Sequence, residues 1–381
     1  MSDFFLELGS IAEFINGAAF KPEDWGETGK KIIRIQNLTD PNKPFNRTER
    51  IVSDRVQVQY GDLLVSWSAT LGVFEWKDSE EALLNQHIFR VLPNEEKVNK
   101  RYLRHGLEGA IVDMQKHLHG ATMKHVNRGE FLSTNLYLPP LEEQKRIAEI
   151  LDRTQSLISK RKEAIELLDT LTQSIFIEMF GDPVTNPKQW KTKPLRSVCD
   201  EINDCPHSTP DWTEQGVVCL RTSNLSKGGW NWDDKRFVSE ETYHERSKRG
   251  YIEANDIILS REGTVGIAAI VTPEMKICMG QRLVQVRPSS SLLTSDFALR
   301  HLLYVLAPTQ ISRLMVGSTS QHLNVKELRD LIIPIPPITL QQKFSEQMAV
   351  LEKLKATHRT SLTELQALFA SLQHRAFRGE L

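Results

Sequence analysis

The chain has 381 residues, of which 40% are hydrophobic and 25% charged, and its formal net charge is -1. This composition is typical of a globular protein with two or three domains, and it lacks the basic excess usual in dedicated DNA-binding proteins. Local Lys and Arg could still contact phosphates. No apolar run of about 18 residues could span a bilayer, and the first residues lack signal-peptide features, so we expect a cytoplasmic protein without a membrane partner.

Residues 1–140 predict a mixed α/β (α+β) domain. Short apolar runs such as "IIRI", "DLLVSW" and "HIFRVL" are broken by Gly, Pro, Asn and Asp, a pattern that indicates strands and turns. The later stretch "NKRYLRHGLEGAIVDMQKHL" indicates a helix.

Residues 141–181 predict one long helix. No Pro or Gly occurs from Leu141 to Phe180, and apolar residues recur at spacings of three and four. At 1.5 Å per residue the helix would be about 60 Å long. The predicted pairing seam includes Ile147, Leu157, Arg161, Leu168 and Leu171.

Residues 182–337 repeat the first domain, and residues 338–381 repeat the helix. "GATMKHVNRGEF" at Gly120 and "GSTSQHLNVKEL" at Gly317 are 197 positions apart, and this offset continues through both helices. Further upstream the offset is 187, where "FING" matches "EIND" and "RIQNL" matches "RTSNL". Between these, "GDLLVSWSATLG" matches "NDIILSREGTVG".

The second helix carries a seam in the same register as the first. It includes Phe344, Leu354, His358, Leu365 and Leu368. The first helix leaves domain one and reaches domain two, where the second helix begins, so antiparallel pairing is the simplest arrangement. We therefore expect two similar domains joined by two long antiparallel coiled-coil helices with pseudo-twofold symmetry, and Arg161 close to His358. A structural coiled coil or oligomer stalk is the alternative.

The four cysteines do not predict a metal site, because their spacing is not a zinc pattern. In the repeat Cys199, Cys205 and Cys219 match Ala12, Ala18 and Ile32. We therefore expect small buried residues and no metal.

The repeated motifs resemble those of one known family. The order of domains and helices, the "GD/ND-hydrophobic-S…G" stretch, the turn before "PIPP" and the helix opening "LEEQKRI" resemble the specificity subunit of Type I restriction-modification systems, over nearly all of the chain. The resemblance implies that each domain is a target recognition domain for one half of a bipartite asymmetric sequence in double-stranded DNA.

The resemblance also implies partners and cofactors. The helices would set the spacer between the half-sites and dock two methylase subunits, and up to two restriction (motor-nuclease) subunits would complete the complex. S-adenosylmethionine, ATP and Mg would be bound by the partners and none by this chain. No methylase, Walker A or dinucleotide motif occurs, so we expect a non-catalytic subunit of a complex that methylates adenine and cleaves DNA.

Candidate DNA-binding residues have side chains that can read base edges or follow the repeated motifs. They are Arg34, Asn37, Trp67 and Lys124 in the first copy, and Arg221, Ser223, Asn224, Lys227, Arg261 and Gln321 in the second. The shared pairs Arg34/Arg221 and Asn37/Asn224 could instead be structural or phosphate-binding, because residues that read different bases should differ between copies.

Two other classes of protein remain open from the sequence. A non-enzymatic scaffold of duplicated protein-binding domains on a coiled coil would explain the repeat without DNA affinity. An enzyme would need convergent acid, base or nucleophile groups, and no such set recurs in both copies.

Overall fold

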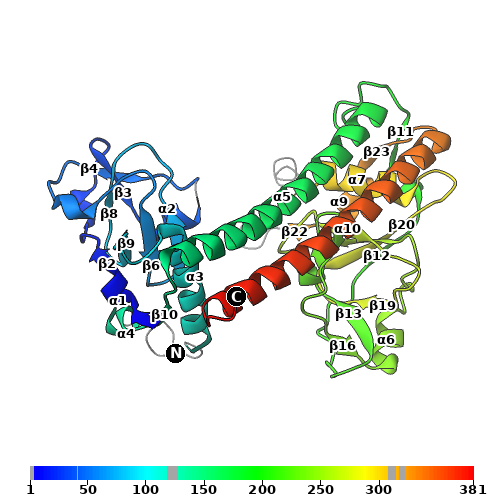
Figure 1. Cartoon of the computed structure of the whole chain (residues 1–381). Coiled ribbons are helices and arrows are strands. Elements are labelled where there is room, and N and C mark those ends of the chain that lie inside the picture. The colour runs from blue at the N-terminus through cyan, green and yellow to red at the C-terminus, as the bar shows by residue number, and fades with distance from the viewer. Residues whose placement is uncertain (1–3, 41, 118–127, 308–314, 317–321) are drawn as a thin grey trace. The chain divides into compact units, whose positions relative to one another are not determined.

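The computed structural model describes residues 4–40, 42–117, 128–307, 315–316 and 322–381 (Figure 1). The chain forms two compact units. Unit 1 comprises residues 1–162 and 360–381, and unit 2 comprises residues 163–359. Both long helices are therefore divided between the units, whereas the domain boundaries predicted from the sequence lie at the ends of the helices.

Unit 1 is built on a four-stranded antiparallel sheet in the order β2-β9-β6-β7, with a second sheet, β4-β3-β8-β5, beside it. Its helix α3 packs with the first sheet in one hydrophobic core. The elements are β1 (Phe5–Glu7), α1 (Leu8–Ile11), β2 (Ala12–Asn16), η2 (Pro22–Asp24), β3 (Lys30–Ile33), α2 (Ile35–Thr39), β4 (Asn46–Thr48), η3 (Asp54–Val56), β5 (Gln57–Val58), β6 (Leu63–Ser66), β7 (Gly72–Glu75), β8 (Ala82–Leu84), β9 (Ile88–Pro93), α3 (Lys100–His117), α4 (Arg128–Leu132), β10 (Asn135–Tyr137) and α5 (Leu141–Phe180).

Unit 2 repeats this plan with a four-stranded sheet, β12-β20-β17-β18, and a smaller sheet, β16-β13-β19. Helix α7 takes the place of α3 in its main core. The elements are β11 (Thr192–Pro194), η4 (Leu195–Ser197), β12 (Cys199–Asp204), β13 (Val217–Leu220), η5 (Thr222–Asn224), β14 (Leu225–Ser226), β15 (Gly229–Trp230), β16 (Phe237–Val238), α6 (Glu240–Arg246), β17 (Ile257–Ser260), β18 (Ala268–Ile270), β19 (Ile277–Met279), β20 (Leu283–Pro288), α7 (Ser295–Val305), β21 (Met315–Val316), β22 (His322–Leu323), α9 (Val325–Asp330), β23 (Ile332–Pro334) and α10 (Ile338–Ala376).

Along β2 and β12, the structurally equivalent residues of the two units are shifted by one position from the pairs that the sequence repeat predicts. A bulge between Cys199 and Glu201 adds a residue to β12, so Asp204, and not Asn203, takes the place of Asn16. Cys205 then matches Gly17, and the sequence pairing with Ala18 was wrong. The expected burial is confirmed for Cys205 and Cys219 but not for Cys199, which is partly exposed, and Cys278 is buried as well.

Contacts within each unit show that α5 and α10 are antiparallel. In unit 1, Ile147 near the start of α5 shares a core with Ala376 at the end of α10. In unit 2, Phe176 near the end of α5 lies 5.6 Å, ring to ring, from Phe344 near the start of α10. The start of each helix therefore meets the end of the other.

At every second position of the predicted pairing seam, the residue that faces the other helix is the one that follows the predicted residue. Ile147 and Phe344 are buried as expected, and Arg161, Leu168, His358 and Leu365 are partly buried. The prediction is wrong for the other four seam residues, which are 43–51% exposed: Leu157, Leu171, Leu354 and Leu368.

The residues that follow these leucines take their places in the seam. Thr172 is buried beside exposed Leu171, and Lys355 is buried beside exposed Leu354. Two carboxylates surround the buried Lys355, whose Nζ lies 2.7 Å from Asp169 Oδ1 and 2.9 Å from Glu352 Oε1. A hydrophobic pattern cannot select a threonine or a lysine over a neighbouring leucine. The approach of Arg161 to His358 stays a prediction.

A buried glutamine attaches each long helix to its domain. Gln341 Oε1 accepts a hydrogen bond from the Thr294 backbone N–H at 2.9 Å, and its Nε2 donates to the Leu292 and Pro336 carbonyls. Gln144 makes the same three bonds in unit 1, with the backbone of Asn99, Lys97 and Pro139. This shared clasp explains why Gln144 and Gln341 match in the repeat.

We expect Gln341→Leu to lower the free energy of unfolding by about 3 kcal/mol or more, because it leaves three backbone groups without partners in a buried site. Urea unfolding followed by circular dichroism measures the change. The control is Gln342→Leu at the next, exposed position, where we expect a change within about 0.5 kcal/mol. Equal effects of the two substitutions would contradict the clasp.

Candidate nucleic-acid interface

The predicted DNA-binding residues on the loops after β3, β6, β13 and β17 gather at one edge in each unit, which we call the carboxyl edge. In unit 1 the parallel strands β3 and β8 end together, since Asn85 N–H donates to the Ile33 carbonyl at 3.1 Å. In unit 2 β13 and β19 end together, since Gly280 N–H donates to the Leu220 carbonyl at 2.8 Å. Parallel strands with aligned ends bring the loops that follow them to the same place.

The loop after β6 or β17 joins this edge through identical backbone contacts. Trp67 N–H donates to the His87 carbonyl at 3.2 Å, and Arg261 N–H donates to the Arg282 carbonyl at 3.0 Å. The buried Ser66 and Ser260 hydroxyls each donate to the carbonyl two residues on. The frame is therefore the same in both units.

The side chains on this frame differ in unit 1 from those in unit 2. In unit 1 the indole Nε1 of Trp67 donates to Asn16 Oδ1 at 3.4 Å, and the Trp67 ring lies edge-on to His87 at a centroid distance of 4.9 Å. Arg34, on the same edge, lies over the Trp25 ring at 5.1 Å and donates to Asn46. This edge therefore carries aromatic, amide and imidazole groups together with the Arg34 guanidinium.

In unit 2 the same edge is strongly charged. Arg261 Nε lies 3.1 Å from Asp204 Oδ1, whose other oxygen is 3.1 Å from His207 Nε2. Arg282 is 57% exposed, with Glu262 at 3.6 Å. Arg221 pairs with Asp234 at 2.5 Å, and this contact lowers the pKa of that carboxyl.

Asn37 and Asn224 do not reach the surface, which corrects their prediction as DNA contacts. The Asn37 amide accepts from Arg34 N–H and donates to the Lys43 and Pro44 carbonyls. The Asn224 amide holds the equivalent loop in unit 2 by accepting from Arg221 N–H. Both side chains are buried, so the structural alternative accounts for this pair.

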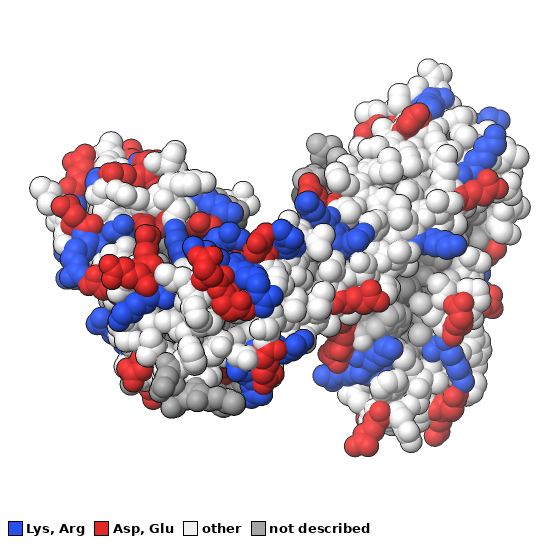
Figure 2. Space-filling view, viewed as in Figure 1, with Lys and Arg blue, Asp and Glu red and all other residues white. Residues whose placement is uncertain are grey.

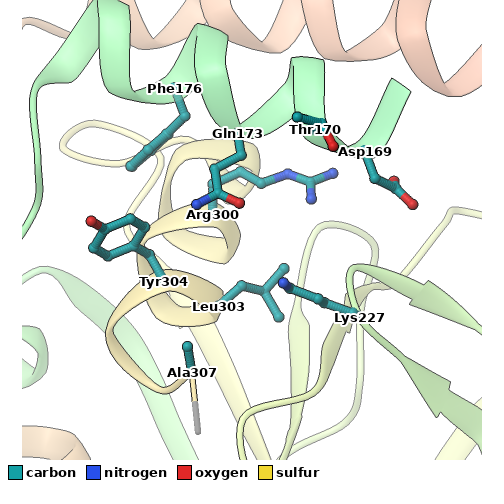
Figure 3. Close-up of a pocket in the computed structure, with 9 residues that line it drawn as sticks. All are labelled: Asp169, Thr170, Gln173, Phe176, Lys227, Arg300, Leu303, Tyr304 and Ala307. Atoms are coloured by element: carbon teal, nitrogen blue, oxygen red, sulfur yellow. The ribbon is translucent and has the colours of Figure 1, made fainter. Parts of the chain in front are cut away.

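The remaining predicted residues are distributed differently. Ser223 is exposed beside Arg221. Lys227 points into a cavity of about 360 Å³ between α5 and α7, where Arg300 also lies, and so it is not grouped with the carboxyl edge (Figure 3). Lys124 and Gln321 lie outside the described residues.

Sequence reasoning missed Asn16, Asp204, His87 and Arg282 as members of the edge. His87 and Arg282 occupy the same place in "NQHIF" and "GQRLV", and both have positive φ, 72° and 68°. The available signal was a residue that differs within an otherwise matching stretch. The bulge in β12 concealed the match of Asn16 with Asp204.

Charges of both signs are interspersed over the face drawn in Figure 2. On this face, local clusters and not a single basic field therefore decide where an anion can bind. Within the described residues, no three His, Cys, Asp or Glu side chains are grouped to hold a metal ion. None of the described helices is long and apolar enough to cross a membrane.

The fold and the repeated edge define a protein with two copies of one recognition domain, and the comparison with known families agrees. The model of the Type I restriction modification DNA specificity domain matches residues 4–167 and again residues 187–367. The chain belongs to this family.

Individual relatives share the full arrangement. The chain is 24% identical to the EcoBI specificity subunit of Escherichia coli, over 99% of this chain and 85% of that protein. It is 20% identical to the MjaVIII specificity subunit of Methanocaldococcus jannaschii, over 94% and 93% of the two chains.

Solved structures have the same fold. A structure from work on assembly and conformational transition of the type I R-M system matches 99% of this chain and 98% of its own, with a TM-score of 0.57 and 19% identity. A Type I S subunit from M. genitalium matches 98% and 95% of the chains, with a TM-score of 0.56 and 13% identity.

Proposed function

We propose that this chain is the DNA specificity subunit of a Type I restriction-modification complex and reads a bipartite, asymmetric site in double-stranded DNA. The observation that carries the proposal is that the same loop frame occurs in both units with different side chains. Two readers with one frame and different contact groups suit two half-sites of different sequence.

In this proposal the chain itself performs no chemistry. Two methylase subunits bind S-adenosylmethionine and methylate adenine, and up to two restriction subunits bind ATP and Mg and cleave DNA. The family and the specificity subunits among its relatives support the partner subunits, and the cofactors are part of the proposal because methylation and ATP-driven cleavage require them. The chain determines which DNA sequence is recognised, and it provides the surface on which the partner subunits assemble.

Exposed aliphatic side chains on the long helices support a docking surface for the methylase subunits. In unit 2, Leu167 and Leu171 on α5 are 61% and 44% exposed, and Val350 and Leu354 on α10 are 68% and 43% exposed. Each pair is spaced by four residues and therefore lies on one helix face. A partner helix would bury these side chains while the opposite faces form the pairing seam.

We expect Leu354→Asp to reduce methylase binding about tenfold or more, because burial of a leucine contributes about 1.5–3 kcal/mol and each 1.4 kcal/mol is a tenfold change in affinity. Co-purification and titration calorimetry with the methylase subunit measure the loss. The control is Thr357→Asp, an exposed polar position on the same helix. Unchanged binding of the leucine variant would place the docking surface elsewhere.

The proposed function is tested by producing the chain with its methylase subunit and mapping methylated adenines by single-molecule sequencing. We expect methylation in one bipartite asymmetric motif, and gel shifts that require that motif. A protein-binding scaffold predicts no DNA affinity in either assay. A chain with enzymatic activity of its own would act without the methylase subunit.

A further inference from the structure

Three positions at the carboxyl edge differ between the units although their backbone is equivalent. They are Asn16, Trp67 and His87 in unit 1, and Asp204, Arg261 and Arg282 in unit 2. We call each set the reading triad of its unit. We propose that the reading triads decide which base pair each unit prefers at one position of its half-site. This inference rests on the proposed function.

Contacts within each triad make its members one group. Trp67 touches both other members in unit 1, through the Asn16 amide and the His87 ring. Arg261 does the same in unit 2, through its ion pair with Asp204 and its backbone bond to Arg282. The side-chain contact orients residue 67 or 261 against residue 16 or 204, and the backbone bond fixes the place of residue 87 or 282 beside them.

The backbone supports a role in binding. His87 and Arg282 both have left-handed φ, which is unfavourable for residues other than glycine. Such conformations cluster at ligand-binding sites, and here both units keep one at the same place. The turn presents the side chain of Arg282 to solvent, where it is 57% exposed.

The chemistry of the triads points to different bases. Arginine can bind both acceptors of guanine in the major groove, so the exposed guanidinium of Arg282 favours a G·C pair. The second guanidinium of this triad, that of Arg261, is already paired with Asp204. The unit 1 triad contains neither Arg nor Lys. The exposed Asn16 amide suits adenine, and the Trp67 ring offers apolar surface to a thymine methyl group, so unit 1 favours an A·T pair.

The test uses the full chain with its methylase subunits and a library of DNA sites randomised in both half-sites. Wild type should require a G·C pair at one position of the half-site read by unit 2. Arg282→Ala should weaken this preference about tenfold or more and leave the other half-site unchanged. Lys276→Ala is the control, because Lys276 is 56% exposed just before β19, at the opposite end of that strand.

Arg282→Ala could also disturb the left-handed turn, so a second substitution at this position tests the side chain separately. Asn tolerates left-handed backbone and pairs with adenine, so Arg282→Asn should move the preference at that position from guanine toward adenine. His87→Arg should create a G·C preference in the other half-site, since arginine already occupies this turn in unit 2.

The outcomes separate the inference from the proposed function. A wild-type complex without any bipartite motif would refute the proposed function. A wild-type motif that Arg282→Ala, Arg282→Asn and His87→Arg all leave unchanged would refute only the reading triads. Equal loss of affinity for all sequences with an unchanged melting temperature would also refute them, because it would identify Arg282 as a phosphate contact.

Discussion

A fragment of residues 1–181, produced with the methylase subunit, is expected to modify an interrupted palindrome in place of an asymmetric site. The fragment holds one domain and one long helix, and two copies can pair their α5 helices about a true twofold axis. Such a dimer is isologous. Two identical readers on inverted half-sites recognise only an inverted repeat of the first half-site.

The structure shows what the second copy must supply. The core of unit 1 includes Ala376 of α10, with Phe369 and Leu372 packed against it, and all three are absent from the fragment. In the dimer, the equivalent positions on α5 of the partner copy, which are 197 residues earlier in the sequence, hold Met179, Thr172 and Ile175. Fitting methionine where alanine is buried costs about 1–3 kcal/mol, so we expect a weaker dimer than the native pairing.

Arg161 adds to this cost because it would meet Arg161 of the other copy near the twofold axis, where like charges repel. We therefore expect Arg161→Leu to strengthen the dimer. Sedimentation measures the dimer, and single-molecule sequencing of methylated adenines reads the motif. Methylation confined to the original asymmetric site, or a folded dimer that modifies no inverted repeat, would contradict this prediction.

Exchange of residues 1–140 for the corresponding domain of a relative is expected to change one half-site completely and leave the other unchanged. The clasp should survive the exchange, because Gln144 bonds only backbone groups of the incoming domain. The side-chain contacts to α5, in contrast, require particular residues in the incoming domain. Asp152 binds His105 at 2.7 Å and Arg104 at 2.6 Å, and Arg101 completes the group.

The choice of donor domain provides the control. A donor that keeps an Arg-His pair at positions 104 and 105 should give an active hybrid, whereas one without it should lose stability, since Asp152 is partly buried and would lose its partners. Motif mapping of the hybrid complex measures the change. A simultaneous change in both half-sites would contradict the assignment of one domain to each half-site.

The repeat, the two long helices and the family could be predicted from the amino-acid sequence alone. Each of these depends on a signal that extends over many residues, such as the constant 197-residue offset or the 40 residues from Leu141 to Phe180 without Pro or Gly. Antiparallel pairing also followed, because the connections between domains and helices allow little else. Arg261 was found because its side chain can read a base edge, and Trp67 because it occupies the equivalent place in the first copy.

Which of two adjacent residues faces a partner helix or strand depends on packing in three dimensions, and the sequence did not reveal it. Leu171 and Thr172 fit the same helical spacing, and packing of α5 against α10 buries the threonine. A single bulge in β12 likewise moved Asp204 into the place of Asn16. Asn37 matched the expected chemistry of a base contact, but its amide holds its own loop. These outcomes depend on contacts between residues distant in sequence or on the local path of the backbone, neither of which residue spacing encodes.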